Sequence, residues 1–212
     1  MSELHIKKDS EIVQERLIKA AFELFLNNDY NKVTTRQLAK QANTSLSMIQ
    51  YYFGDKQTLY NTMVREQFRG ISLALEQAYS EESGLNFSQL MLSYLEIHQN
   101  NPDFPAFITK ILAYKNGPGY MLFAEILDNK RELIKKIVKA SQSNNQMSKQ
   151  VDVDVLRIIM MSLTVFPFLI KDVLALSSKS SMEGNLMEKV ARFSGALLDK
   201  HTRPDQDGIW QI

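Results

Sequence analysis

The chain has 212 residues, 44% of them hydrophobic and 23% charged, a composition typical of a globular protein with one mid-sized or two small domains. Its formal net charge of +1 excludes a polybasic nucleic-acid coat, so any affinity for DNA must come from a local patch. The absence of cysteine excludes a disulfide framework, a thiolate metal site and a cysteine nucleophile.

Glycine and proline are few and no strand-length alternation is present, so a helical chain is expected throughout. Residues 1–9 are expected to fray, and Ser10 can cap a first helix. The apolar residues on one face of that helix are Val13, Leu17, Ala20, Ala21, Leu24 and Phe25.

Residues 33–56 predict two short helices joined by a turn of about four residues. Thr34 and Gln37 form the T-x-x-Q version of a capping box at the start of the first helix. Its apolar stripe consists of Leu38, Ala39 and Ala42. Asn43 follows where the chain must turn, and asparagine tolerates the left-handed conformation that ends helices.

The second short helix is expected to begin after Ser45, which can act as its cap. Ile49 and Phe53 lie four residues apart and should face inward, and Asp55 can cap the next helix. The outer face is then formed by Leu46, Ser47, Met48, Gln50, Tyr51 and Tyr52.

This outer face has the chemistry of a DNA major-groove reader. Gln50 can pair bidentately with adenine, Ser47 can bond to several bases, and Leu46 or Met48 can contact a thymine methyl. Thr34, Tyr52 and Lys56 can hold phosphates, and Arg36 can reach a phosphate or a guanine edge. The predicted DNA-binding residues are Thr34, Thr35, Arg36, Ser45, Leu46, Ser47, Met48, Gln50, Tyr51, Tyr52 and Lys56. The alternative is a helical pair whose outer face is merely solvated.

Residues 31–56 contain four cationic residues (Lys32, Arg36, Lys40 and Lys56) and one anionic residue, Asp55, so their net charge is 4 − 1 = +3. A modest excess of this sign suits a phosphate backbone.

Further helices are expected at 56–80, 87–99, from Phe104, along 123–138, and at roughly 152–177 and 182–200. The polar stretch 141–149 is expected to be mobile. Residues 155–176 are apolar on nearly every side and should be buried on nearly every side, with a kink at Pro167. The apolar region 155–170 contains Arg157 and is expected to be too short to span a bilayer. With no signal-peptide core at the N-terminus, a soluble cytoplasmic protein without membrane contact is expected.

Residues 15–69 resemble the N-terminal domain of the TetR family of transcriptional regulators. The matching pieces are ERLIKAAFELF at 15–25, Tyr30, VTTRQLAKQA at 33–42, SLSMIQYYF at 45–53 and GDKQTLY at 54–60. The family usually has glycine where Asn43 stands, an apolar residue where Thr44 stands, and often glycine just before the aromatic at Tyr30.

The resemblance implies an all-α fold of about nine helices, with an N-terminal three-helix helix-turn-helix domain at 1–55 and a C-terminal ligand-binding and dimerisation domain at 56–212. It implies a homodimer through the last two helices, about 152–177 and 182–200, and the C-terminal apolar surface favours the same assembly. Two readers on a symmetric dimer match a palindromic operator in double-stranded DNA. The alternative is that these helices only complete the core of one chain.

The resemblance also implies a cavity for a small-molecule effector in the C-terminal domain, and the abundance of Met and Phe suits a largely apolar ligand. The candidate ligand-binding residues are Tyr94, His98, Phe107, Met121, Phe123, Met160 and Phe166. For any one of them, packing in the core is the simpler alternative. Tyr94 and His98, four residues apart, can equally form a structural hydrogen-bonded pair.

The sequence lacks G-x-S-x-G, Walker-type, H-E-x-x-H and G-x-G-x-x-G motifs, so neither an enzyme nor a cofactor or metal site is expected. The leading hypothesis is a ligand-responsive repressor that a small molecule releases from its operator. The alternatives are a DNA-bound structural or cell-division control protein of the same fold without an effector, and a helical partner-binding protein that has lost DNA recognition.

Overall fold

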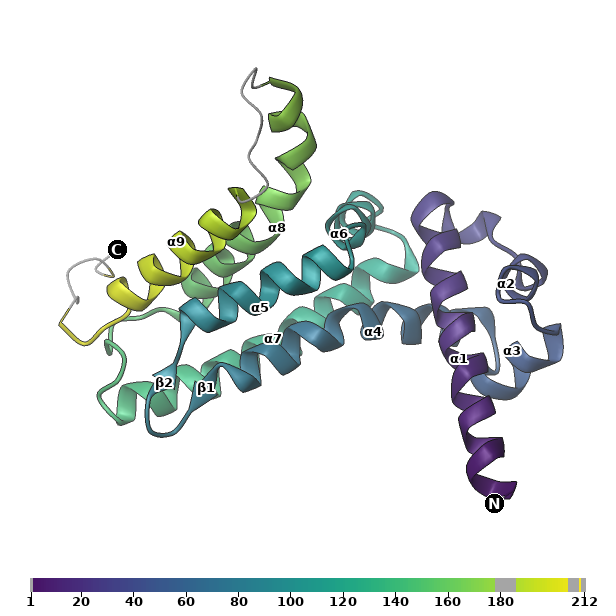
Figure 1. The fold of residues 1–212 in the computed structure, drawn as a ribbon, viewed down its shortest axis with the longest axis horizontal. Helices are drawn as coiled ribbons and strands as arrows, with labels where there is room; N and C mark the ends of the chain where they lie inside the picture. The colour runs from purple at the N-terminus through teal and green to yellow at the C-terminus, as the bar shows by residue number, and fades with distance from the viewer. Residues whose placement is uncertain (1, 178–185, 206–209, 211–212) are drawn as a thin grey trace. The chain divides into compact units, whose positions relative to one another are not determined.

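The computed structural model describes residues 2–177, 186–205 and 210 of the chain. Within these residues the fold has nine α-helices, one short 3-10 helix and one two-stranded ladder, which confirms the predicted all-α class (Figure 1). The ladder pairs β1, Tyr79–Ser80, with β2, Gly84–Leu85, in antiparallel register. Strands of two residues are too short to produce an alternating pattern, so the sequence did not predict them.

The helices form two compact units that do not follow the predicted boundary between residues 55 and 56. Unit 1 comprises Met1–Phe68 and Phe107–Ile126, and unit 2 comprises Arg69–Ala106 and Leu127–Ile212. Two long helices contribute to both units: α4, Lys56–Gln77, and α7, Pro118–Ser143. A helical pattern identifies an apolar face but does not tell which elements cover it along its length.

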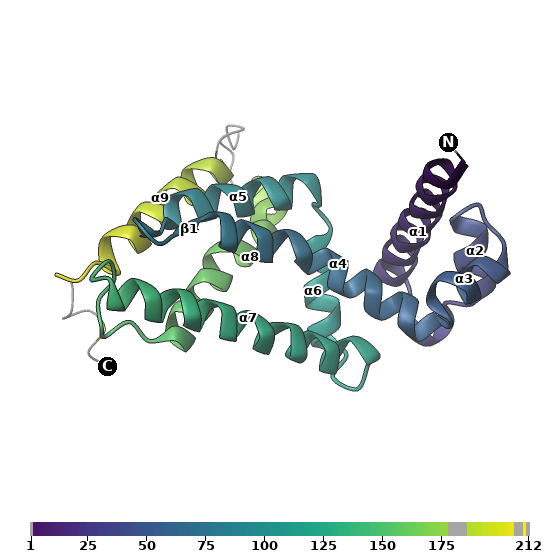
Figure 2. The same cartoon turned by 90° about the horizontal axis from the view of Figure 1, so that it is seen from below.

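Unit 1 begins with α1, Ser2–Asn27, and the short η1, Tyr30–Lys32. Because α1 starts at Ser2, Ser10 lies inside the helix and is not its cap, contrary to the sequence expectation. The next helices are α2, Thr35–Gln41, and α3, Leu46–Phe53, which lie side by side in Figures 1 and 2. Leu17, Ala21 and Phe25 of α1 are buried, as predicted, in the core that α2 and α3 complete.

The second piece of unit 1 comes from α6, Phe104–Ala113, and the first third of α7. The Phe107 ring packs against Phe22 with 5.2 Å between centroids, and Phe123 packs against Phe68 at 5.3 Å. A core built by α1 and α4 is therefore completed by residues more than 50 positions away in the sequence.

Unit 2 is a helical cluster formed by α5, Phe87–Asn100, α8, Val153–Ser177, α9, Leu186–His201, and the unit 2 portions of α4 and α7. Asn86 caps α5 by accepting from the Gln89 N–H at 2.8 Å, and Asp152 accepts from the first N–H groups of α8. The core of unit 2 includes Leu90, Met91, Val138, Leu156 and Met160.

Helices α5 and α9 run alongside each other and are closely packed (Figure 2). The Asp199 carboxylate accepts hydrogen bonds from the backbone N–H groups of Phe87 and Ser88 at 2.8 and 3.0 Å, so α9 supplies an anion to the N-terminus of α5. Gly195 permits this contact, because a Cβ there would lie 2.5 Å from the Ser88 Cα.

The polar stretch after α7, expected to be mobile, is folded back on unit 2. Met147 and Ser148 are buried, and the Ser148 N–H donates to the Thr202 carbonyl at 2.8 Å. Trp210, whose position the sequence left open, packs against the unit 2 core and donates from Nε1 to the His201 carbonyl at 2.7 Å.

Helix α8 departs from the expectation of burial on nearly every side. An 18-residue window within Val153–Leu176 has a mean hydropathy of 2.0, yet only 17% of that window is buried within the chain. By length and composition this helix could cross a membrane, so the expectation that the region is too short was wrong. Exposed apolar side chains on α8 include Ile158, Phe166, Leu169 and Val173, which follow helical spacing and define the stripe called the α8 face below.

Candidate nucleic-acid interface

The start of α2 confirms the predicted capping box. The Gln37 N–H donates to the Thr34 hydroxyl at 3.2 Å, and the Thr34 N–H donates to the Gln37 side-chain oxygen at 2.8 Å. Thr34 and Arg36 are exposed and Thr35 is half-buried, so this end of α2 presents hydroxyl groups and a guanidinium to solvent.

The turn after α2 ends the helix in a left-handed residue, as predicted for Asn43, whose φ is 49°. The Thr44 N–H donates to the Ala39 carbonyl at 2.9 Å and the Asn43 N–H to the Lys40 carbonyl at 3.1 Å. This pair of hydrogen bonds is the Schellman arrangement. It fixes the four-residue connection to α3, and asparagine performs the backbone role that glycine usually has.

Helix α3 presents one buried and one exposed side. Ile49 and Phe53 are buried, as predicted, and hold the helix against the rest of unit 1. The exposed residues are Ser45, Leu46, Ser47, Met48, Gln50 and Tyr51, while Tyr52 is half-buried. Tyr51 is 78% exposed, and its ring lies 4.9 Å from that of Tyr52 in an edge-on contact.

Ser45 occupies the N-cap position of α3 but does not cap it with its side chain. Its hydroxyl lies 2.7 Å from the Ser47 hydroxyl instead. The sequence expectation assumed the commonest partner of such a serine, a backbone N–H, whereas a second hydroxyl two residues later competes for it.

The beginning of α4 is held by Asp55, which accepts from the Thr58 N–H at 2.7 Å, as predicted. Lys56 has a structural role that the sequence did not predict. Its ammonium donates to the carbonyls of Tyr30 and Val33 at 3.1 and 3.0 Å and lies 4.2 Å above the Tyr30 ring. Two of its three N–H bonds therefore fasten η1 to α4, and a phosphate contact through Lys56 stays a prediction.

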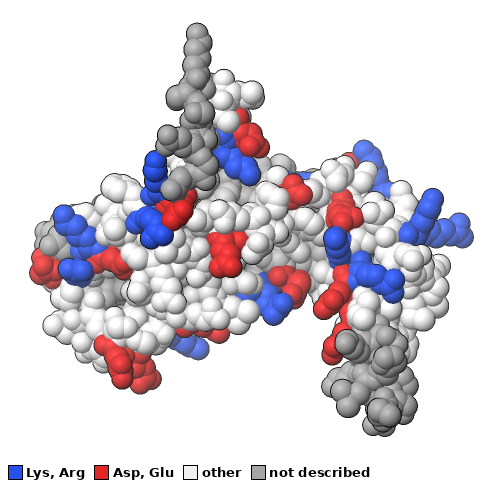
Figure 3. Space-filling model, viewed as in Figure 1, with Lys and Arg blue, Asp and Glu red and all other residues white. Residues whose placement is uncertain are grey.

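Helix α3 contains no charged residue, so the positive charge of the interface comes from its neighbours. Arg36 and Lys40 on α2 are exposed, as is Lys32, which pairs with Asp29 at 3.0 Å. On the face drawn in Figure 3, Lys and Arg side chains lie over the region of α2. An uncharged helix flanked by cations can place neutral side chains against base edges while its flanks hold phosphates.

The predicted ligand-binding residues are not gathered in one place. Tyr94, His98 and Met160 are buried in unit 2, whereas Phe107 and Phe123 are core residues of unit 1. Met121 and Phe166 are 74% and 56% exposed, so neither lines an interior cavity of the described chain. Apolar composition identified these side chains without distinguishing a core from a pocket or a surface.

Tyr94 and His98 lie four residues apart on α5, and the His98 ring packs against two aromatic rings in tilted contacts. The imidazole centroid lies 4.4 Å from the Phe168 ring and 5.7 Å from the Phe104 ring, and Nδ1 is buried without a hydrogen-bond partner. Burial lowers the pKa of His98 to about 4. The neighbouring cavity, lined in part by Tyr94 and Phe168, measures about 10 Å³, room for about one water molecule.

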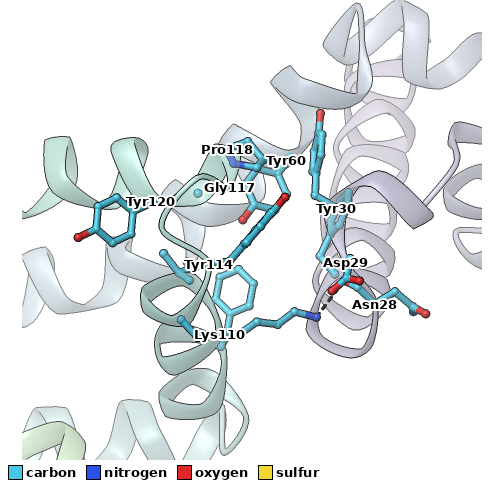
Figure 4. A pocket seen from close by; sticks show the side chains of 14 residues that line it. Asn28, Asp29, Tyr30, Tyr60, Lys110, Tyr114, Gly117, Pro118 and Tyr120 are labelled. Atoms are coloured by element: carbon cyan, nitrogen blue, oxygen red, sulfur yellow. Dashed lines mark hydrogen bonds between the residues drawn. The ribbon is translucent and has the colours of Figure 1, made fainter.

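A larger cavity of about 220 Å³ lies within unit 1, where the sequence reasoning placed no ligand site. Figure 4 shows Tyr30 and Tyr60 beside it, Tyr114 and Gly117 from the α6–α7 connection, and Lys110 reaching from α6 toward the end of α1. Of the predicted ligand residues, only Phe107 lines it. A signal was present in the sequence, since tyrosines flank the N-G-P-G loop at 116–119.

Among the residues that the structure describes, no group of three or more His, Cys, Asp or Glu side chains is placed to hold a metal ion.

Comparison with known proteins agrees with this architecture. Residues 17–63 match the family model described as "Bacterial regulatory proteins, tetR family". The chain is 28% identical over 99 residues, or 45% of its length, to the "Probable HTH-type transcriptional regulator YttP" of Bacillus subtilis (strain 168). The match spans 48%, about half, of that relative.

Two solved structures share the fold. A TetR-family transcriptional regulator from Haemophilus influenzae is 19% identical, with a TM-score of 0.65 over 90% of this chain and 97% of the other. A tetR-family regulatory protein from Rhodococcus is 15% identical, with a TM-score of 0.62 over 91% and 97%.

Proposed function

We propose that this chain, whose residues 17–63 match the model of the tetR family of bacterial regulatory proteins, is a transcriptional repressor that binds a palindromic operator as a homodimer and responds to a small molecule. The observation that carries this proposal is the exposed, uncharged face of α3, which follows a capped α2 and a well-formed turn. The protein acts in the cytoplasm, where its operator lies, and performs no catalysis.

The chemistry of α3 favours adenine and thymine over guanine and cytosine. The helix has no arginine or lysine to pair with guanine and no carboxylate to accept from cytosine. Gln50 is exposed and matches the donor and acceptor of adenine, while Leu46 and Met48 expose apolar atoms suited to a thymine methyl. The half-site read by α3 is therefore rich in A·T pairs, with Arg36 the candidate for any flanking guanine.

The unburied apolar surface of α8 and α9 supports the dimer. Phe193 and Leu197 on α9 are exposed as well, and α9 packs against α8. Exposed apolar side chains in this number are typical of an interface. A second copy related by a twofold axis covers it with the same residues, and the two α3 helices then address half-sites about 34–36 Å apart or a multiple of this spacing.

An effector acts by binding two conformations of the dimer unequally. Helix α4 begins directly after α3 and continues into unit 2, so a change in the orientation of α4 changes the position of α3. A coupling of about 1–3 kcal/mol changes operator affinity by about 5- to 150-fold.

The alternative, a DNA-bound structural or division-control protein without an effector, is favoured by one observation. The cavity beside His98 has room for about one water molecule, too little for an organic ligand. The two functions differ in whether any small molecule releases the bound DNA.

Selection of bound DNA from a random pool, followed by salt-dependent affinity measurements, tests the proposal. Recovered sequences should contain a palindrome with A·T-rich half-sites. Gln50→Ala should reduce affinity for the selected site by about 1–3 kcal/mol and relax preference at one base position. Gln77→Ala, an exposed glutamine at the end of α4, serves as the control and should leave affinity unchanged. Failure to recover any preferred sequence would refute DNA reading by α3.

A further inference from the structure

The cavity of unit 1 is built mainly from aromatic rings and closely approaching backbone. Phe25, Tyr30, Tyr60 and Phe107 line it, together with Tyr114 from the α6–α7 connection and Tyr120 from the first turn of α7. A Cβ at Gly117 would collide with the Tyr114 ring, and one at Gly119 would collide with the Tyr60 hydroxyl. The two glycines thus let the main chain lie directly against the rings, which leaves flat walls suited to a planar molecule.

The charged groups at the cavity already have hydrogen-bond partners within the protein. The Lys110 ammonium donates to the carbonyls of Leu26 and Asn28 at 3.0 and 2.9 Å. The Asp29 carboxylate pairs with Lys32, and this hydrogen bond lowers the pKa of Asp29. Burial raises the pKa of Tyr60 to about 12 and also raises the pKa of Tyr30, so both hydroxyls stay neutral. A neutral ligand leaves these contacts intact, whereas an anion would compete with the two carbonyls for Lys110 and a cation would compete with Lys32 for Asp29.

The cavity volume limits the size of its occupant. Drug-sized ligands occupy cavities of about 300–1,000 Å³, so a space of about 220 Å³ suits a molecule of one or two fused rings. Aromatic walls stabilise such a molecule through ring packing, and the phenolic hydroxyls can exchange a hydrogen bond with one polar substituent.

The same rings adjoin the entry to the helix-turn-helix. Tyr30 packs on Phe25 at 5.5 Å and on Tyr60 at 5.1 Å between ring centroids, and its carbonyl accepts from Lys56. Lys56 also donates to Val33, the residue before the Thr34 cap of α2. A molecule that displaces Tyr30 or Tyr60 therefore disturbs the contact that fixes the start of α2.

We propose that this cavity binds a small, neutral, planar aromatic molecule and that its occupancy changes DNA affinity through Tyr30 and Lys56. The claim that a ligand binds depends on the cavity alone, while the claim that binding changes DNA affinity rests on the function proposed above. The cavity residues between 107 and 120 lie outside the segment 17–63 that matches the family model.

The test uses the full chain and 2-naphthol as a fluorescent probe, with the 1-naphthoate anion and a naphthyl trimethylammonium cation as charged analogues. The neutral probe should bind saturably and each charged analogue about tenfold or more weakly. Ala113→Trp, on the exposed rim of the cavity, should weaken 2-naphthol binding about tenfold or more. Leu112→Trp is the matched control, because Leu112 is exposed on the same helix and does not line the cavity.

Absence of saturable binding, preference for a charged analogue, or equal effects of the two tryptophan variants would each overturn the ligand site. Operator affinity is then measured with and without 2-naphthol, and a change of about fivefold or more is expected that Ala113→Trp abolishes. Binding without any change in operator affinity would overturn the coupling. Because DNA binding is first measured without the probe, failure of the regulator proposal is recognised separately.

Discussion

Individual residues of the helix-turn-helix divide into those governed by local rules and those governed by distant partners. The roles of Thr34, Asn43 and Asp55 follow from hydrogen bonds within four or five residues, and all three were predicted from the sequence. The role of Lys56 depends on the carbonyls of Tyr30 and Val33, more than 20 residues earlier. Sequence spacing cannot reveal such a contact, so the charge of Lys56 was interpreted only as a phosphate ligand.

Replacement of Lys56 by alanine should therefore reduce stability as well as DNA binding. The change removes two charge-assisted hydrogen bonds and a ring contact, and we expect the free energy of unfolding to fall by about 1–3 kcal/mol. Lys40→Ala, at an exposed lysine of α2, should change it by less than about 0.5 kcal/mol. Urea denaturation of both variants checks this, and equal stabilities would contradict the fastening role.

His98 should make stability depend on pH. Its pKa is about 4 in the folded chain and near 6.5 when unfolded, so the unfolded chain binds more protons between these values. The free energy of unfolding should fall, by at most about 3 kcal/mol, as the pH drops from 6.5 to 4.

His98→Phe should flatten this part of the stability profile, measured by denaturation at a series of pH values. Asp154, whose pKa the Arg131 hydrogen bond lowers to about 2, acts below this window and serves as an internal reference. A profile unchanged by His98→Phe would show that the imidazole is not the titrating group.

The bounds of whole helices were predicted better than the elements against which they pack. The spacing of apolar residues and the position of Pro102 predicted α5 within one residue, and α8 likewise. The β1–β2 ladder and the folded-back segment at 141–149 were missed, because their order comes from tertiary hydrogen bonds rather than from local periodicity. Pairing of α5 with α9 depends on Gly195 and Asp199, and the spacing of residues within α9 does not identify the helix that these two residues contact.

Two helical glycines should respond oppositely to alanine. At Gly195 the new Cβ would meet the backbone of Ser88 at 2.5 Å, so Gly195→Ala should lower the free energy of unfolding by about 1–3 kcal/mol. At Gly70 the nearest atoms belong to the Ile97 side chain at 3.6 Å, an ordinary contact, so Gly70→Ala should raise it by about 0.4–1 kcal/mol. Thermal denaturation distinguishes the two, and a stabilising Gly195→Ala would refute the close α5–α9 approach.

For the whole molecule, the sequence predicted the fold class and the helix-turn-helix, but it did not predict which segments make up each of the two compact units. The split of α4 and α7 between two units arises from side-chain packing such as Phe68 on Phe123, which no local pattern encodes. The sequence predicted the apolar excess of α8, and only 17% of its apolar window is buried within the chain.

Charge placed on the α8 face should separate the proposed dimer. Phe166→Glu and Val173→Glu lie at exposed positions, so each chain should still fold. Burial of a carboxylate in the interface should raise the dimer dissociation constant about 100-fold or more, equivalent to about 3 kcal/mol. Sedimentation velocity measures this, with Met121→Glu, exposed and outside α8 and α9, as the control. Persistence of the dimer in both α8 variants would place the interface elsewhere.

The discontinuous makeup of unit 1 also bears on how the protein is synthesised. Because Phe107 and Phe123 complete the core around Phe22 and Phe68, the helix-turn-helix cannot finish packing until residue 126 has left the ribosome. Until then the nascent chain exposes aromatic side chains that later become interior, and fragments cut after residue 55 or 68 should be prone to aggregation. Maturation of the helix-turn-helix thus waits for residues 107–126 to be translated.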